Sequence, residues 1–348
     1  MGSLARVVTC AFAAVLVALP AAPLGSAPGA SAYAAGAGDR PSSFTIEDER
    51  ITESSGLAAS RAHPGVYWTH NDSDDGPYVY AVDSRTGRTV ATVTLRGIGD
   101  PRDVEAVSVG PDGQVYVADI GDNMGGTWPK VWIYAFPEPK RLADTTVTAK
   151  QYTVQYADGP RDAEAMMVHP KTGRVYIVSK REEGGGLYAG PAKLSTTGVN
   201  RFERVGDVDV WATDGAFSPD GGHLVLRGYF ESALFDWRDG KPKKIAEPRM
   251  PIQQQGESVT YTLDGGTLMY GTEGRHSRVS AVHLDDDQVS PQVRRERGKD
   301  GGADGGKGSL ADGDADGDGD SGNYYLVGVL LVVCTALGMA GRRLFRRR

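Results

Sequence analysis

The sequence predicts an all-β fold, a β-propeller of four-stranded blades around a central channel, followed by one C-terminal transmembrane helix. Three observations predict it. A short unit recurs along the chain, runs of β-branched and aromatic residues alternate with Gly, Asp and Pro turns, and an apolar segment free of charge lies near the C-terminus.

The recurring unit opens with an acidic residue beside small residues, runs through a few apolar residues, turns, and enters a β-rich run. It begins at Glu53, Glu105, Glu164, Asp214 and Glu257, with start-to-start spacings of 52, 59, 50 and 43 residues. A period of roughly 40–50 residues is typical of propeller blades. Five blades are favoured, and six, with a degenerate blade between Lys180 and Asp209, is the alternative.

Each unit accommodates four strands, expected in the second unit at 106–109, 115–119, 131–136 and 148–156. The fifth unit is one strand short, while residues 44–50 precede the first unit. We therefore expect this N-terminal segment to complete the last blade, which would remove an open sheet edge. No segment before the C-terminal region has a long helical period.

The two ends of the chain predict export and anchoring. Arg6, an apolar stretch over 7–19 and Ala-x-Ala sites up to Ala34 indicate a signal peptide at 1–34. Residues 324–341 are long enough for a membrane helix, and the arginine-rich tail 342–348 then lies in the cytoplasm by the positive-inside rule. The expected location is the cell membrane, with a single pass and an extracellular ectodomain.

The region between these ends divides into an ectodomain at 44–293 and a Gly/Asp-rich linker at 294–323, whose composition predicts disorder. Cys10 and Cys334 lie outside the ectodomain, which excludes a disulfide framework and a Cys-ligated zinc site there. Removing the six positive charges of Arg6 and the tail arginines from the net charge of −7 leaves −13. Such an acidic surface argues against nucleic-acid binding.

The acidic-opening unit and the run Asp119-Ile120-Gly121-Asp122-Asn123 resemble bacterial secreted β-propeller repeat proteins, of the WD-repeat-like and phytase-esterase-like kind. The resemblance covers roughly residues 45–284. It implies the propeller architecture and leaves the activity open, because propellers have many unrelated functions. The Gly-His and Trp-Asp pairs of true WD repeats are absent, since Arg238 follows Trp237.

The candidate site is the mouth of the channel, where equivalent positions of the blades converge. The five acidic residues that open the units are expected to form a ring of carboxylates there. The ends of the second strands would lie on the same face, and they contribute His70, Asn71, Asp72, Asp119, Asp122, Asn123, Lys180, Arg181, Arg227 and Glu273.

Three interpretations of this ring follow. The carboxylates Glu53, Glu105, Glu164, Asp214 and Glu257 would suit a hard divalent cation such as Ca²⁺, in a protein that binds an extracellular ligand or partner. Alternatively, they would serve a hydrolase acting on a phosphoester, ester or glycan, with one carboxyl as proton donor. In a purely structural surface module they would pair with Lys180 and Arg227 or accept backbone amides of neighbouring blades.

Overall fold

Strands make up nearly all the regular structure. The computed structural model describes residues 41–73 and 75–300, and within them it contains strands β1 to β21 and one helix, α1. The prediction of an all-β fold is confirmed. None of the described helices is long and apolar enough to cross a membrane. The predicted signal peptide at 1–34, membrane helix at 324–341 and basic tail at 342–348 lie outside the described residues.

The first sheet follows the first predicted unit and gains one strand from later in the chain. Its strands, in spatial order, are β2 (Ser54–Ala59), β3 (Val66–Asn71), β4 (Tyr78–Asp83), β5 (Thr89–Arg96) and β9 (Thr145–Thr148). The first four form an antiparallel meander, whereas β9 adds parallel to β5. The outer edge of β5 is thereby covered, which protects it from pairing with another chain.

The second and third units are joined into one eight-stranded sheet. The second contributes β6 (Val104–Val109), β7 (Gln114–Asp119), β8 (Val131–Pro137) and β10 (Lys150–Tyr156), close to the predicted ranges. The third contributes β11 (Ala163–Val168), β12 (Val175–Ser179), β13 (Gly185–Ala189) and β14 (Val199–Val208). The outermost strands β10 and β14 pair in parallel, which makes the two units continuous.

The last two sheets have four strands each. One contains β15 (Ala212–Phe217), β16 (His223–Gly228), β17 (Ser232–Arg238) and β18 (Lys241–Ala246), and the other β19 (Gly256–Tyr261), β20 (Thr267–Thr272), β21 (Arg278–His283) and β1 (Phe44–Thr45). The N-terminal strand β1 pairs antiparallel with β21, as expected, although it is only two residues long. The segment that follows continues the attachment, since the Ile46 amide donates to the Ser277 carbonyl.

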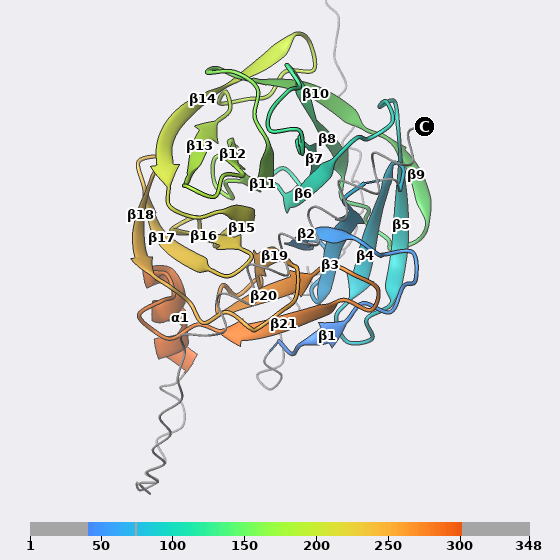
Figure 1. Ribbon diagram of the computed structural model, residues 1–348. Helices are drawn as coiled ribbons and strands as arrows, with labels where there is room; N and C mark the ends of the chain where they lie inside the picture. Colours follow the sequence, from blue (N-terminus) through green and yellow to red (C-terminus); the bar gives the residue numbers. More distant parts are fainter. Residues whose placement is uncertain (1–40, 74, 301–348) are drawn as a thin grey trace, which may run out of the picture. The chain divides into compact units, whose positions relative to one another are not determined.

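The first strands of the five units pack on one another in cyclic order, β2 on β6, then β11, β15 and β19, which returns to β2. Figure 1 shows these strands at the centre of the ring of sheets. Among the described residues, five apolar clusters fill the spaces between successive units, one for each neighbouring pair of units. Trp68 and Phe136, for example, meet edge-on in the cluster between the first sheet and the second. The propeller-like arrangement therefore follows from face-to-face burial of every sheet.

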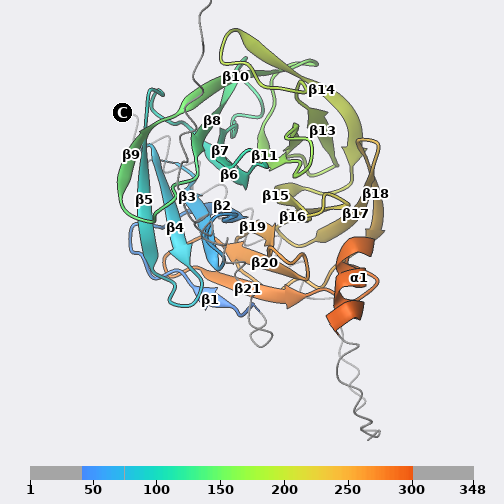
Figure 2. The same ribbon diagram turned by 180° about the vertical axis from the view of Figure 1, so that it is seen from behind.

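Helix α1 (Pro291–Asp300) extends beyond the predicted end of the ectodomain at residue 293, into the predicted disordered linker. Ser290 caps it, because its Oγ accepts the amide of Val293, and a proline at the first helical position suits a helix start. Val289 and Val293 are buried among residues of β16, β17 and β19. Both views place α1 beside the sheets of β15–β18 and β19–β21 (Figures 1 and 2). Packing of two valines thus orders a segment whose composition alone predicts a linker.

Candidate functional site

The innermost strands share an irregularity near their beginnings. In four of them one residue is skipped in the pairing with the second strand, and these residues are Glu105, Glu164, Thr213 and Glu257. In β2 the skipped residues are Ser55 and Gly56. An extra residue of this kind is a β-bulge, which re-aims a side chain and is common beside functional sites. The fold therefore repeats one special position at this end of the ring.

The residues found at this repeated position differ from the predicted ring of five acids. Glu105, Glu164 and Glu257 occupy it, whereas Thr213 occupies it in β15. Glu53 precedes β2 and lies outside the strand, and Asp214 lies one residue beyond the bulge. Because strand side chains alternate between faces, a slip of one residue places a side chain on the other face. The five acidic residues are therefore not structural equivalents.

Asp214 has a structural role of its own. It is fully buried, and its carboxylate accepts the amides of Gly215 (2.7 Å) and Val259 (2.9 Å), with a further backbone hydrogen bond from Leu57. Burial raises the pKa of Asp214 well above its usual value, although these amides oppose the shift. Asp214 thus ties β15 to both β19 and β2, as the structural interpretation of the acids predicted.

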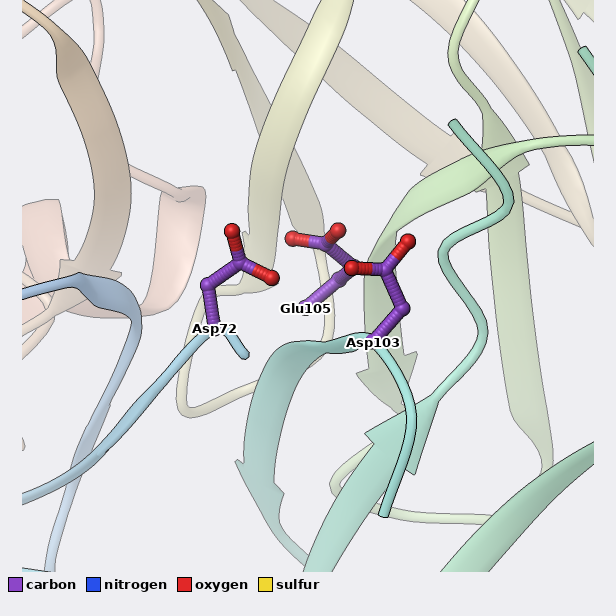
Figure 3. Close-up of side chains that lie close together, drawn as sticks. All are labelled: Asp72, Asp103 and Glu105. Atoms are coloured by element: carbon purple, nitrogen blue, oxygen red, sulfur yellow. The ribbon is translucent and has the colours of Figure 1, made fainter. Parts of the chain in front are cut away.

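Three carboxylates converge at one side of the mouth, from Asp72, Asp103 and Glu105 (Figure 3). Each offers one oxygen, and these oxygens all lie within 4.8 Å of one another. Two ligands of a Ca²⁺ ion at 2.3–2.6 Å are at most about 5 Å apart, so this spacing fits. We call these residues the three-carboxylate group. Asp72 and Glu105 were predicted, and Asp103 was missed.

Backbone contacts fix Asp72 between two sheets. Its amide donates to the carbonyl of Glu53 (2.9 Å), and its carbonyl accepts the amide of Val104 (2.8 Å). On the opposite side of the group, the amide of Asp103 donates to Oδ1 of Asp119 (3.0 Å). The positions of Asp72 and Asp103 are therefore set by main-chain geometry.

Neighbouring side chains complete the group. Ser55 Oγ donates to Oε2 of Glu105 (3.1 Å), and Asn123 Nδ2 donates to Oδ2 of Asp103 (3.0 Å). A Cβ at position 121 would lie 2.8 Å from Asp103 Oδ2 and would overlap Glu105 Oε1, so only Gly121 admits this close approach. The predicted Asn123 thus belongs to the site, as a donor to one carboxylate.

Several predicted residues hold the surrounding loops instead. Asn71 Oδ1 accepts hydrogen bonds from the amides of Thr52 and Glu53, in the segment before β2. In the same way, Asp119 Oδ1 accepts the amide of Asp103, in the segment before β6. Asp119 Oδ2 also accepts the hydroxyl of Tyr134 (2.7 Å). These carboxylate and amide oxygens are buried, and they organise the backbone next to the three-carboxylate group.

Asp122 and Glu273 are likewise scaffold residues. Asp122 accepts the amides of Thr127 and Trp128, which fixes the loop between β7 and β8. Glu273 accepts a hydrogen bond from Gln255 Nε2 (2.8 Å) at the end of β20. The predicted Arg181 is exposed beyond the end of β12.

Lys180 pairs with Glu164 on the other side of the mouth. Lys180 Nζ contacts Oε1 of Glu164 and donates to the hydroxyl of Tyr229 (2.9 Å). Glu164 Oε2 is buried and has no hydrogen-bond partner among the described residues. Tyr229 was not predicted, because a tyrosine beyond the end of β16 has no counterpart in the other units.

Arg227 is fully buried and mainly holds backbone. Its Nη1 donates to the carbonyls of Ser258 (2.9 Å) and Gly271 (2.7 Å), and Nη2 donates to Oε1 of Gln253 (3.0 Å). Burial lowers the pKa of Arg227 to about 10, while the charge of Glu257 opposes the shift. The predicted ion pairing of the ring thus applies to Lys180 directly, whereas Arg227 stabilises the mouth through carbonyls.

The electrostatics connect these residues into one set, which we call the mouth cluster. It comprises Asp72, Asp103, Glu105, Glu164, Glu257, Lys180 and Arg227. Burial, followed by the charges of Asp72, Glu164 and Asp103, raises the pKa of Glu105 well above its usual value. Burial also raises the pKa of Glu164, and Lys180 opposes it. Five carboxylates beside two cations leave an excess of buried negative charge, which is costly unless a cation or protons compensate it.

His70 lies near the end of β3 and is neutral. Its Nδ1 is 3.1 Å from the carbonyl of Asn71, and Nε2 packs against Gly56 without a hydrogen-bond partner among the described residues. Burial lowers the pKa of His70 to about 4. A neutral imidazole adds no positive charge to offset the carboxylates.

Comparisons with known proteins give no assignment. No known protein family matches the sequence, and no curated protein matches it. Among solved structures, hydrazine synthase from Kuenenia stuttgartiensis is similar with a TM-score of 0.38 and 13% identity, over 69% of this chain and 68% of that chain. A chain of the mitotic checkpoint complex is similar with a TM-score of 0.36 and 14% identity, over 66% of this chain and 63% of that chain. A Bacteroides uniformis protein assigned as a 6-phosphogluconolactonase is similar with a TM-score of 0.38 and 14% identity, over 68% of each chain. Likenesses this weak carry no argument about activity.

Proposed function

We propose that this protein is a membrane-anchored extracellular β-propeller that binds a ligand through a divalent cation held by the three-carboxylate group of the mouth cluster. The observation that carries the proposal is the convergence of Asp72, Asp103 and Glu105 within 4.8 Å. Calcium is the expected ion, because carboxylate oxygens are hard ligands and the group has no nitrogen or sulfur donor. The hydrolytic alternative stays a prediction.

Five blades are part of the proposal. The five innermost strands contact one another in cyclic order, and an apolar cluster lies between each pair of neighbouring units. The parallel pairing of β10 with β14 joins two of these units at their outer edges only, so the joined sheet counts as two blades. Five blades around one axis bring the bulged positions close together at the mouth.

The extracellular location rests on the sequence of the two ends. A signal peptide at 1–34, a membrane helix at 324–341 and a basic tail at 342–348 would place residues 44–293 outside the cell. An extracellular setting also suits the proposed ion, since weak extracellular calcium sites have dissociation constants of about 10⁻⁴–10⁻³ M. The site would then be filled at the calcium concentration outside cells.

Thermal unfolding of the full-length protein in mild detergent tests the cation. Chelator should lower the melting temperature and added calcium should restore it, because a ligand at a hundredfold excess over its Kd stabilises by about 2.7 kcal/mol. Glu105→Gln should abolish the calcium response, since it removes one of the three ligand oxygens. Glu257→Gln is the matched control, because Glu257 occupies the same bulged position in another blade and lies outside the three-carboxylate group.

The two variants separate the outcomes. Loss of the calcium response in Glu105→Gln and its retention in Glu257→Gln would support the site. A wild-type protein whose melting temperature is the same in chelator and in about 10–100 mM calcium, a hundredfold excess over these dissociation constants, would refute the proposed cation.

A further inference from the structure

Three exposed apolar residues lie on loops that contact the mouth cluster. Met124, Phe230 and Ile252 have exposed fractions of 78%, 45% and 105%. Each is the direct chain neighbour of a residue that hydrogen-bonds a mouth residue, and these bonds join Asn123 to Asp103 (3.0 Å), Tyr229 to Lys180 (2.9 Å) and Gln253 to Arg227 (3.0 Å). The three apolar residues therefore lie on three different loops next to the mouth, between β7 and β8, between β16 and β17, and between β18 and β19.

The loop that carries Met124 is fixed in place. Asp122 accepts the amide of Trp128 (2.6 Å), and the guanidinium of Arg102 lies 3.6 Å from the centre of the Trp128 ring. Gly126 has a φ of 88° and leaves no room for a Cβ against Arg161. The backbone of this loop is therefore held in place before binding, which lowers the cost of ordering the segment that carries Met124.

Aromatic contacts similarly support Phe230. Its ring lies 6.3 Å from that of Tyr229, which meets Trp211 edge-on at 5.2 Å. The face thus offers tryptophan, tyrosine, methionine and arginine, the residue types enriched in protein interfaces. By contrast, the exposed Leu263 lies beyond the end of β19, at the opposite end of the ring.

Charge selects among possible occupants of this face. The formal charge of the mouth cluster stays negative even with one divalent cation, since five carboxyl groups lie beside two basic side chains. Nucleic acid and anionic lipid would be repelled, and so would the same acidic face of a second copy. A basic protein segment is complementary to the mouth, and apolar residues within that segment would cover the surrounding side chains.

We propose that this mouth face docks a partner protein through a Lys- or Arg-rich segment whose apolar residues contact Met124, Phe230 and Ile252. The inference rests on the proposed binding role of the mouth and names the ligand as a basic polypeptide. It does not require the cation, because the apolar contacts and the net charge remain without it.

Fluorescence anisotropy with three labelled peptides of equal length and equal leucine content tests the proposal. Their remaining residues would be all arginine, all serine or all glutamate. The full-length protein should bind the arginine peptide at least about tenfold more tightly than the other two, and raised salt should weaken this binding. Phe230→Ser and Met124→Ser should each weaken it about tenfold. Leu263→Ser is the matched control and should leave it unchanged.

Failure of the docking proposal can be distinguished from failure of the cation proposal. Equal binding of the serine and arginine peptides, or equal binding by wild type and Phe230→Ser, would overturn the docking face. An equal loss in Leu263→Ser would overturn it as well. Repeating the titration in chelator separates the two proposals. If the arginine peptide still binds while the melting temperature does not respond to calcium, the docking face is supported and the cation site is refuted.

Discussion

Replacing Lys180 with methionine would remove the ammonium group that contacts Glu164 in the mouth cluster. Side-chain exposures are 15% for Lys180 and 5% for Glu164, so the pair is largely shielded from water. Breaking a buried pair by removing one partner costs about 3–5 kcal/mol, because the other charge stays buried without compensation. We therefore expect Lys180→Met to lower the free energy of unfolding by about this amount.

Urea unfolding followed by tryptophan fluorescence would measure the change. At a melting-temperature shift of about 2–4 °C per kcal/mol for a domain of this size, the same loss corresponds to about 6–20 °C. Lys193→Met is the control, since Lys193 is exposed and should change stability by less than about 0.5 kcal/mol.

The partner variant completes a double-mutant cycle. Glu164→Gln in the Lys180→Met background removes the uncompensated carboxylate, so the double variant should regain about 1–3 kcal/mol over Lys180→Met alone. If the double variant is no more stable than Lys180→Met, or if the single variant costs less than about 1 kcal/mol, the pairing argument is wrong.

Two further predictions concern the scaffold and the location. Gly256→Ala should cost about 3 kcal/mol or more in urea unfolding, because a Cβ there would overlap Nη2 of Arg227 and disrupt its charged hydrogen bonds to Ser258 and Gly271. Gly206→Ala, where a Cβ would meet nothing within 4 Å, should be near neutral, and equal losses in the two variants would contradict the packing argument. A membrane-impermeant amine reagent should label lysines of residues 41–300 on intact cells, and labelling seen only after lysis would contradict the extracellular orientation.

Local signals were sufficient to predict the four strands of the second unit and their order. The runs around Val115 and Val131 and their intervening turns gave strand positions within a few residues of β7 and β8. The parallel pairings of β9 with β5 and β10 with β14 were missed. Strands distant in sequence make these contacts at outer edges, and no residue pattern within either strand indicates its partner.

The site was predicted in part, for a similar reason. Glu105 and Asp72 were identified because they lie at the beginning of an inner strand and the end of a second strand. The equivalence assigned to Asp214 was wrong, because Thr213 occupies the bulged position in β15. The distance to the next turn could have shown this, since Pro111, Pro170 and Pro219 each follow the bulged residue of their strand by six positions. Asp103 could have been found from its position two residues before Glu105, which places it at the same end of the strand.

Helix α1 had a usable signal that the overall composition obscured. Ser290 followed by Pro291 is a favourable helix start, and Val293 supplies an apolar contact. The surrounding charged and polar residues nevertheless lowered the helical periodicity of the segment. Tertiary burial of a few side chains decided the structure there.

Diffraction from crystals of the full-length protein grown in calcium, recorded at a long wavelength, would test the central claim most directly. The account predicts an anomalous difference peak within about 2.3–2.6 Å of oxygens from Asp72, Asp103 and Glu105. The peak should be absent from crystals of Glu105→Gln grown in the same solution. A wild-type map without a peak among these three carboxylates, at a saturating calcium concentration, would contradict the proposed cation site.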